Sequence, residues 1–420
     1  MSSVALRQGL VELLRGRGHV RDDRVAAAFG AVPREVFLAD HAERHGLADV
    51  YRDDAIVTRR DGAGTPTSSS SQPAIMAEML EMLGLRAGQR VLEIGAGTGY
   101  NAALLSHLVG DEGRVTSVEL DADTAVAARR ALVTSGVPVR VEVGDGAAGW
   151  PAAAPFDAVI ATASTEVVPR AWFDQLRPGG TLVVPLRLSP VVFWLQAVVA
   201  FRKVAHGFDT SAATGGGFMA LRPPERGGDP RDEPPGGTRG APARLAVGEV
   251  ADGGRDRPLL DMVGPALAGL DRVARQRLAV TALGFGRSRR VPVGGSSPLA
   301  LFAYVALALP EERLIEVSRT ADRSTTTRQA LGVVDAVDGS LALLTPGSPE
   351  APGRVRLDAY GGPGAERAVL SAIERWHLAG RPRMGDARIA VRYGPVRPHG
   401  WRSVRRADQW IALDWQPRPH

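Results

Sequence analysis

Residues 91–100 read VLEIGAGTGY, a short apolar run that leads directly into three glycines at alternating positions. The run at 90–94 predicts a buried strand, and the residues from 100 to 109 predict a helix. A glycine-rich turn between a strand and a helix lets the backbone approach a ligand closely. It also leaves the N–H groups of the helix N-terminus free to bind it. The stretch therefore predicts a cofactor-binding turn.

The flanking segments alternate between strand and helix patterns. The apolar periodicity predicts helices at 74–84 and 122–135, and strands at 114–120, 139–143, 156–161 and 181–184, the last after a Pro178-Gly179-Gly180 turn. This alternation predicts an α/β fold, a doubly wound and mainly parallel Rossmann-like sheet. The helical spacing of apolar residues at 3–47 predicts a helical N-terminal cap.

Polar residues stand where such a sheet binds ligands. The glycines Gly95, Gly97 and Gly99 follow the acid Glu93, and their spacing is tighter than the GxGxxG of dinucleotide sites. This favours the methionine moiety of S-adenosylmethionine over a pyrophosphate. Three later strands end in further candidates: Glu119 for the ribose hydroxyls, Asp145 and Gly146 for the adenine, and Thr162 and Ser164 for the pocket wall.

Shifts in composition along the sequence divide the chain into four expected segments. Residues 1–80 comprise the cap and a polar Gly/Ser/Thr/Pro loop at 58–73, which is either disordered or a binding loop. The cofactor domain is expected at 81–221, a Pro/Gly-rich linker at 222–257, and an α+β accessory domain for substrate recognition at 258–420.

The chain has 420 residues, a net charge of +5 and no cysteine, which excludes disulfides and thiolate metal sites. No basic stripe, long apolar run, secretory signal or cluster of metal ligands is recognisable. The sequence therefore predicts a cytoplasmic protein without a nucleic-acid, membrane or metal partner.

Residues 32–187 resemble the protein-L-isoaspartate (D-aspartate) O-methyltransferases. The motifs that carry the resemblance are Val32-Pro33-Arg34-Glu35, Tyr51-x-Asp53, Ser71-x-Pro73, VLEIGAGTGYNAALL, VELD, VGDGAAGW, PFDAVIATAS, Val167-Val168-Pro169 and FDQLRPGGTLVVPL. The resemblance implies methyl transfer from S-adenosylmethionine to a carboxylate of a peptide or protein. It implies that Ser71 is the active-site serine, with Ser70, Gln72, Val168 and Pro169 contacting the substrate.

Two departures from the family pattern point to a subgroup. Repair enzymes usually carry a histidine where this chain has Ala74, and they end near residue 220. A serine-rich loop and a long extension resemble the members that tailor ribosomally made lanthipeptides, lasso peptides and graspetides. The resemblance implies methylation of an aspartate in a cyclised peptide, whose ester then closes to an aspartimide. Two alternatives stay open: isoaspartate repair, and an inactive cofactor-binding partner protein.

Overall fold

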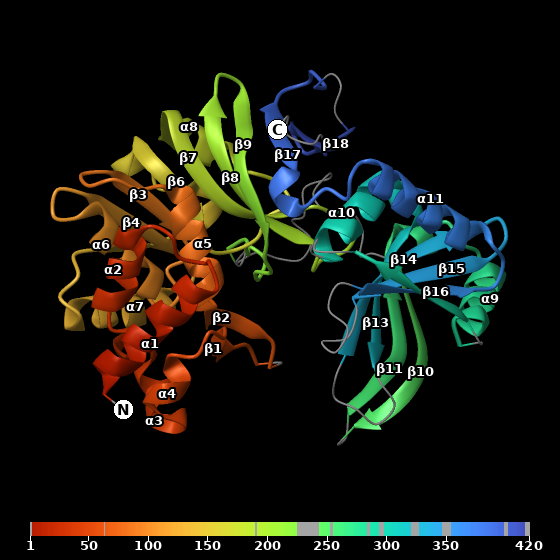
Figure 1. Ribbon diagram of the computed structural model, residues 1–420, viewed down its shortest axis with the longest axis horizontal. Coiled ribbons are helices and arrows are strands. Elements are labelled where there is room, and N and C mark those ends of the chain that lie inside the picture. The colour runs from red at the N-terminus through yellow and green to blue at the C-terminus, as the bar shows by residue number, and fades with distance from the viewer. Residues whose placement is uncertain are drawn as a thin grey trace, which may run out of the picture. The chain divides into compact units, whose positions relative to one another are not determined.

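The structure is a computed structural model that describes residues 2–62, 64–189, 191–224, 243–252, 255–283, 286–293, 298–320, 327–346, 354–398 and 402–415. The chain forms two compact units (Figure 1). The first comprises Met1–Leu186, Ala197–Arg226 and Ile389–Leu413. The second comprises Arg187–Gln196, Gly227–Arg388 and Asp414–His420.

The first unit begins with the predicted helical cap, which consists of short pieces: α1 (Ser3–Gly16), α2 (Asp23–Ala31), α3 (Ala39–His45), α4 (Leu47–Val50) and the 3₁₀ turn Arg34–Leu38. Side-chain caps explain where the first two helices start. Ser2 Oγ accepts from the Ala5 N–H at 3.3 Å, and Asp22 Oδ1 accepts from the Arg24 N–H at 2.8 Å. Apolar residues of this cap share one core with α5 and α6.

The segment 58–73 differs from its prediction as a polar loop, because most of it forms a hairpin. Strand β1 (Ile56–Arg60) pairs antiparallel with β2 (Pro66–Ser70). The Thr58 hydroxyl bonds the Ser68 hydroxyl across the pair at 3.1 Å. Hydroxyl side chains on two neighbouring strands can bond each other across the pair, so a serine run that lacks apolar residues still forms a strand.

The central sheet of the first unit confirms the predicted parallel core and extends it. Its order is β18-β19-β17-β9-β8-β7-β6-β3-β4-β5, and the pairs among β5, β4, β3, β6 and β7 are parallel. The elements are α5 (Pro73–Leu83), β3 (Arg90–Ile94), α6 (Tyr100–Val109), β4 (Arg114–Glu119), α7 (Ala122–Thr134), β5 (Arg140–Val143), β6 (Phe156–Ala161), α8 (Arg170–Gln175), β7 (Leu176–Arg187), β8 (Gln196–Val204) and β9 (Gly207–Gly215).

Strand β7 runs through the Pro178-Gly179-Gly180 segment, where the sequence predicts a turn. Its register with β6 shifts between Phe156 and Ala158, and Gly179 has a φ of +70°. A side chain at Gly180 would lie 2.9 Å from the Asp157 carbonyl oxygen. The glycines therefore allow an irregular strand to stay close to its neighbour.

The other half of this sheet contains antiparallel pairs and includes strands from residues 388–414. Strand β9 pairs with β8 on one side and with β17 (Arg388–Tyr393) on the other, and β18 (Arg402–Arg406) pairs with β19 (Gln409–Asp414). This overturns the predicted boundary of the accessory domain at 258–420, because residues 389–413 belong to the first unit. The backbone pairing explains the assignment: β17 covers the edge that β9 would otherwise expose.

The second unit is a seven-stranded antiparallel sheet with helices, in agreement with the predicted α+β character. Its strand order is β10-β11-β13-β14-β15-β16-β12. The elements are β10 (Arg244–Asp252), β11 (Arg255–Val263), α9 (Arg272–Leu283), β12 (Arg287–Pro292), α10 (Pro298–Ala308), β13 (Leu314–Thr320), β14 (Thr327–Asp335), β15 (Ser340–Pro346), β16 (Arg354–Tyr360) and α11 (Gly364–Leu378).

The predicted linker at 222–257 does not extend to residue 257, because β10 and the start of β11 form strands in its second half. Residues 225–242 of the predicted linker lie outside the described residues. Within the described ranges, no helix is long and apolar enough to cross a membrane.

Candidate active site

The turn after β3 is a cradle that excludes side chains. Gly95 and Gly97 have φ angles of +92° and +52°, and Gly99 has +88°. A Cβ on Gly95 would lie 2.5 Å from Thr162 Oγ1. The Gly95 N–H donates to the Val118 carbonyl at 2.8 Å, which fixes the turn against β4. The backbone is thus open to a ligand at a point where only glycine fits.

Glu119 lies beside this cradle, at the end of β4. The Gly97 N–H donates to its Oε2 at 2.9 Å, and the Asp121 N–H donates to its Oε1 at 3.2 Å. The carboxyl ends of parallel strands share one edge, so an acid here faces the ligand side of the turn. The structure thus places Glu119 beside the glycine turn, and its expected role toward ribose hydroxyls stays a prediction.

Glu93 lies beneath the turn and is fully buried. Asn101 Nδ2 donates to its Oε1 at 2.8 Å, and the Ser117 hydroxyl donates to its Oε2. Burial raises the pKa of Glu93 to about 7, and the nearby charge of Glu119 adds to the shift, while the two hydrogen bonds oppose it. Both carboxylate oxygens are already bonded, so Glu93 supports the turn from inside rather than contacting a ligand as expected.

The remaining expected cofactor residues line the same edge. Asp145 Oδ1 accepts from the Ala147 N–H at 2.9 Å, which shapes the turn at Gly146. A Cβ on Gly146 would lie 2.6 Å from Ile94. The Thr162 hydroxyl lies 2.8 Å from the Gly95 carbonyl, so it contacts the cradle directly. These residues and the glycine turn are brought together as predicted.

Ser164 is buried and joins this edge to a segment that the sequence did not single out. Its N–H donates to the Met219 carbonyl at 2.7 Å, and the Leu221 N–H donates to its carbonyl at 2.7 Å. Its hydroxyl donates to the Phe218 carbonyl at 3.3 Å. The structure thus assigns Ser164 to holding residues 218–221 against the sheet edge.

The β1–β2 hairpin lies over the glycine turn. A Cβ on Gly97 would lie 3.5 Å from the Ser69 carbonyl oxygen and 3.9 Å from Ser68 Oγ. On the other strand, Arg59 Nη1 donates to Asp121 and to Thr124 Oγ1, the latter at 2.8 Å. Arg59 therefore ties the hairpin to the start of α7, next to Glu119. Sequence reasoning missed this arginine because the bond spans two separate elements.

The serines at the end of β2 have different surroundings. Ser70 is buried, and Arg34 Nη2 donates to its hydroxyl at 3.4 Å, so the structure turns it inward instead of toward a substrate. Ser71 is only half-buried, at the point where the hairpin meets α5. Of the two, Ser71 keeps the exposure that its expected role requires.

Arg34 organises this region from inside. Its buried guanidinium donates to the carbonyls of Val50 at 3.0 Å, Arg52 at 3.2 Å and Ser71 at 3.2 Å. Burial lowers the pKa of Arg34, and nearby Tyr100 and Asp53 partly offset the effect. One buried cation that satisfies several loop carbonyls fixes the backbone on which Ser71 stands. Arg34 is part of the Val32-Pro33-Arg34-Glu35 motif of the family resemblance, but the motif alone did not predict that its side chain bonds these loop carbonyls.

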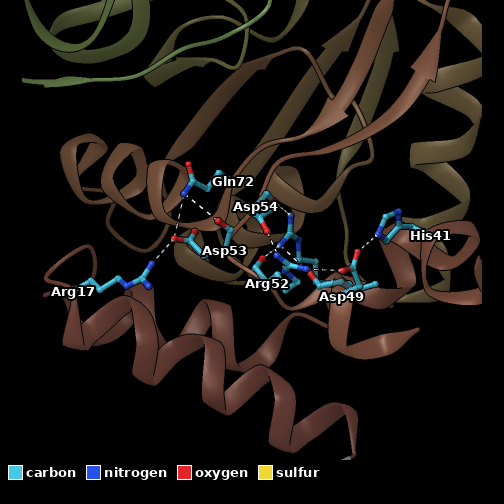
Figure 2. A network of polar contacts seen from close by, with 9 residues as sticks. Arg17, His41, Asp49, Arg52, Asp53, Asp54 and Gln72 are labelled. Atoms are coloured by element: carbon cyan, nitrogen blue, oxygen red, sulfur yellow. Dashed lines mark hydrogen bonds and ion pairs between the residues drawn. The ribbon is translucent and has the colours of Figure 1, made fainter. Parts of the chain in front are cut away.

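Asp53 holds the start of α5, because its Oδ1 accepts from the Ala74 N–H at 2.8 Å. Its Oδ2 accepts from Gln72 Nε2 at 3.2 Å (Figure 2). Arg17 Nη1 approaches the same Oδ2 at 3.4 Å. The exposed Gln72 therefore directs its amide to Asp53, whereas the sequence expected it to contact the substrate.

Val168 and Pro169 also differ from expectation. Val168 is fully buried, and its backbone N–H and carbonyl are both bonded to the side chain of Gln409. The Tyr393 hydroxyl lies 3.0 Å from the Val168 carbonyl and 3.4 Å from that of Pro169. These backbone groups are therefore paired within the protein. No sequence signal identified Gln409, which lies 241 residues away.

Comparisons with known proteins identify the family of the chain. The sequence model of the family "Protein-L-isoaspartate(D-aspartate) O-methyltransferase (PCMT)" matches residues 5–211. The protein-L-isoaspartate O-methyltransferase of Thermotoga maritima is 41% identical over 185 residues, which are 44% of this chain and 56% of that protein. The Methylorubrum populi protein of the same name is 43% identical over 187 residues, 44% of this chain and 81% of that protein.

A solved structure titled protein-L-isoaspartate O-methyltransferase aligns over 92% of this chain and 96% of its own. Its sequence identity is 26% and its TM-score is 0.48. The matched part of the sequence contains the glycine turn, Glu119, Asp145 and the β1–β2 hairpin, whereas β17–β19 lie beyond residue 211. The chain belongs to the protein-L-isoaspartate O-methyltransferase family, a family of S-adenosylmethionine-dependent enzymes.

Proposed function

We propose that this chain transfers a methyl group from S-adenosylmethionine to the free α-carboxylate of an isoaspartyl residue in a peptide or protein. The observation that carries the proposal is the contact between the hairpin and the glycine turn, where Ser69 lies against Gly97. Ser71, which is expected to bind the acceptor carboxylate, follows two residues later, so it belongs to the same segment that contacts the expected cofactor turn.

The residues at the sheet edge fit the cofactor. Gly95 and Gly97 leave a space that a Cβ would fill, and Glu119 offers carboxylate oxygens beside it. Asp145 and Gly146 would hold the adenine, and Thr162 closes the cradle from below. When bound, S-adenosylmethionine supplies a methyl group that is already activated by the sulfonium.

The acceptor requires no base from the protein. The free α-carboxyl of an isoaspartyl residue has an ordinary pKa of about 3.5, so it is ionised at neutral pH and already nucleophilic. The chain therefore has to align the carboxylate and exclude water from it. Ser71 would donate a hydrogen bond to the carboxylate, on a backbone that Arg34 and Asp53 hold in place.

A finer alternative concerns the substrate. The Ser-Gln-Pro loop and the second unit favour a dedicated target, an aspartate in a ribosomally made, cyclised peptide whose ester closes to an aspartimide. The curated relatives that match are named for isoaspartate, so the main proposal takes that acceptor. A chain that binds the cofactor without transferring a methyl group is the third possibility.

Mass spectrometry separates these three possibilities. The full chain is incubated with S-adenosylmethionine and three peptides of one sequence: linear isoaspartyl, linear aspartyl, and aspartyl within a ring. We expect a methyl gain on the isoaspartyl peptide, followed by loss of methanol. Methylation of the ring peptide alone would replace the proposal with the tailoring function. Cofactor binding without a methyl gain on any peptide would contradict both.

A further inference from the structure

The loop that joins β6 to α8 is anchored to the candidate site at both ends. At its start, Ser164 is bonded to the 218–221 segment. At its end, Trp172 Nε1 in α8 donates to the Gly146 carbonyl at 2.8 Å. Residues 165–169 lie between these anchors, at the same sheet edge as the glycine turn. Thr165 donates its N–H to the Pro185 carbonyl in β7 at 3.0 Å.

Further contacts to this loop come from the C-terminal strands. The Val168 N–H donates to Gln409 Oε1 at 3.1 Å, and Gln409 Nε2 donates to the Val168 carbonyl at 2.9 Å. A carboxamide that bonds both polar groups of one residue copies the pairing between residues on adjacent strands. Val168 and Gln409 are both fully buried, so water cannot replace these bonds if the side chain is removed.

Two neighbours reinforce the same loop. Tyr393 donates its hydroxyl to the Val168 carbonyl at 3.0 Å, and Arg406 Nη1 donates to the Glu166 carbonyl at 3.1 Å. Burial raises the pKa of Tyr393, which keeps its hydroxyl protonated and able to donate at neutral pH. All three side chains follow residue 211, so they lie outside the part that matches the family model.

We propose that Gln409 is a positioning residue for acceptor binding, which holds the 165–169 loop in the shape that forms one wall of the acceptor site. This inference rests on the proposed function. The residues that are expected to contact the cofactor are the glycine turn, Glu119 and Thr162, and the bonds that join them do not involve Gln409. Loss of the Gln409 amide should therefore weaken acceptor binding and leave cofactor binding unchanged.

Hydrogen–deuterium exchange tests the positioning without any substrate. Gln409→Met keeps the volume and removes both bonds. We expect the amides of residues 165–168, Pro169 having no N–H, to exchange about tenfold faster than in the wild type. Gln175→Met is the matched control, because Gln175 bonds the Trp150 N–H and the Ala148 carbonyl in the same manner. It should loosen 148–150 and leave 165–169 protected. Unchanged exchange at 165–169 in Gln409→Met would overturn the positioning role.

Steady-state kinetics test the link to the acceptor. For Gln409→Met we expect the KM for the isoaspartyl peptide to rise about tenfold, with kcat and the Kd for S-adenosylmethionine changed less than about twofold. Tyr393→Phe removes a single donor, so it should raise the same KM by less than about threefold, and it serves if Gln409→Met does not fold. A loosened loop with an unchanged acceptor KM would refute the acceptor role.

The two proposals fail in distinguishable ways. A wild-type chain that methylates no isoaspartyl peptide contradicts the proposed function. The exchange experiment still decides, for that same chain, whether Gln409 holds the loop.

Discussion

At the scale of single residues, the site is built from groups whose backbone or burial leaves little freedom. Gly95 has no room for a Cβ because Thr162 is in the way, and Glu93 is a buried acid between two donors. Ser71 is half-buried beside the inward-facing Ser70. Each of these features predicts a different measurable result.

Gly95→Ala is expected to abolish cofactor binding. The new Cβ would lie 2.5 Å from Thr162 Oγ1, at a φ of +92° that disfavours any other residue. Titration calorimetry should show at least about a hundredfold weaker binding of S-adenosylmethionine. The control is Gly9→Ala in α1, where no atom lies within 4 Å of the added Cβ. Binding that is retained in Gly95→Ala would show that the turn is not the cofactor cradle.

Glu93 is expected to make stability depend on pH. Its pKa is about 7 in the fold against an ordinary 4.5, so between these values the unfolded chain loses a proton that the folded chain keeps. Its contribution to the free energy of unfolding is therefore complete below pH 4.5 and declines as pH rises to about 7.

Urea unfolding across that pH range measures the effect. Glu93→Gln should remove this part of the decline, whereas Glu12→Gln on the exposed face of α1 should leave it unchanged. Identical pH profiles for Glu93→Gln and the wild type would mean that Glu93 does not titrate in this range.

Ser71→Ala is expected to lower kcat/KM for the isoaspartyl peptide by about tenfold to a hundredfold, the effect of one hydrogen bond to a charged group. Binding of S-adenosylmethionine, measured by calorimetry, should not change. Thr65→Ala, in the exposed bend of the same hairpin, is the control. If both variants keep wild-type rates, the acceptor does not contact Ser71.

At the scale of elements, the β1–β2 hairpin connects the acceptor side to the cofactor side. It rests on Gly97 through Ser69, and Arg59 ties it to Asp121 at the start of α7. Partial burial raises the pKa of Asp121, but its hydrogen bonds with Thr124 and the charge of Arg59 outweigh this effect, so the pKa lies below its ordinary value. Asp121 is therefore ionised at neutral pH and pairs with Arg59.

Arg59→Met is expected to release the hairpin from α7 while keeping the length of the side chain. The Kd for S-adenosylmethionine should rise about threefold to tenfold, and a protease should cut the hairpin faster. Arg60→Met removes the next arginine, which donates to the nearby Gly64 carbonyl at 2.9 Å within the hairpin, and should leave both quantities unchanged. If Arg59→Met and Arg60→Met had the same Kd for S-adenosylmethionine and the same rate of proteolysis, Arg59 would not stabilise the site.

At the scale of the whole molecule, the chain leaves the first unit and returns to it. The second unit contains Gly227–Arg388, and the sheet of the first unit is completed by Ile389–Leu413. Strand β17 pairs with β9, and Ile389 donates its N–H to Thr210 Oγ1 at 2.7 Å. The methyltransferase unit therefore depends on residues that lie far beyond the conventional end of its sequence motifs.

Two shortened chains test this dependence. A chain of residues 1–224 lacks β17–β19, exposes the edge of β9 and should have a markedly lower Tm and aggregate. A chain in which a flexible Gly/Ser linker replaces residues 227–388 keeps these strands and should bind S-adenosylmethionine like the wild type. Differential scanning calorimetry compares them. Equal Tm values would show that the returning strands contribute nothing to the fold.

Local sequence alone determined the parallel core and the position of the cofactor turn. Periodicity and glycine spacing are properties of neighbouring residues, so strand β3, helix α6 and the acids at 119 and 145 could be predicted from them. Only the tertiary structure decided that Ser70 and Glu93 face inward and that Gln409 pairs with Val168. Such contacts join residues that are distant in sequence, and burial determines which of them pair, so no local sequence pattern predicts them.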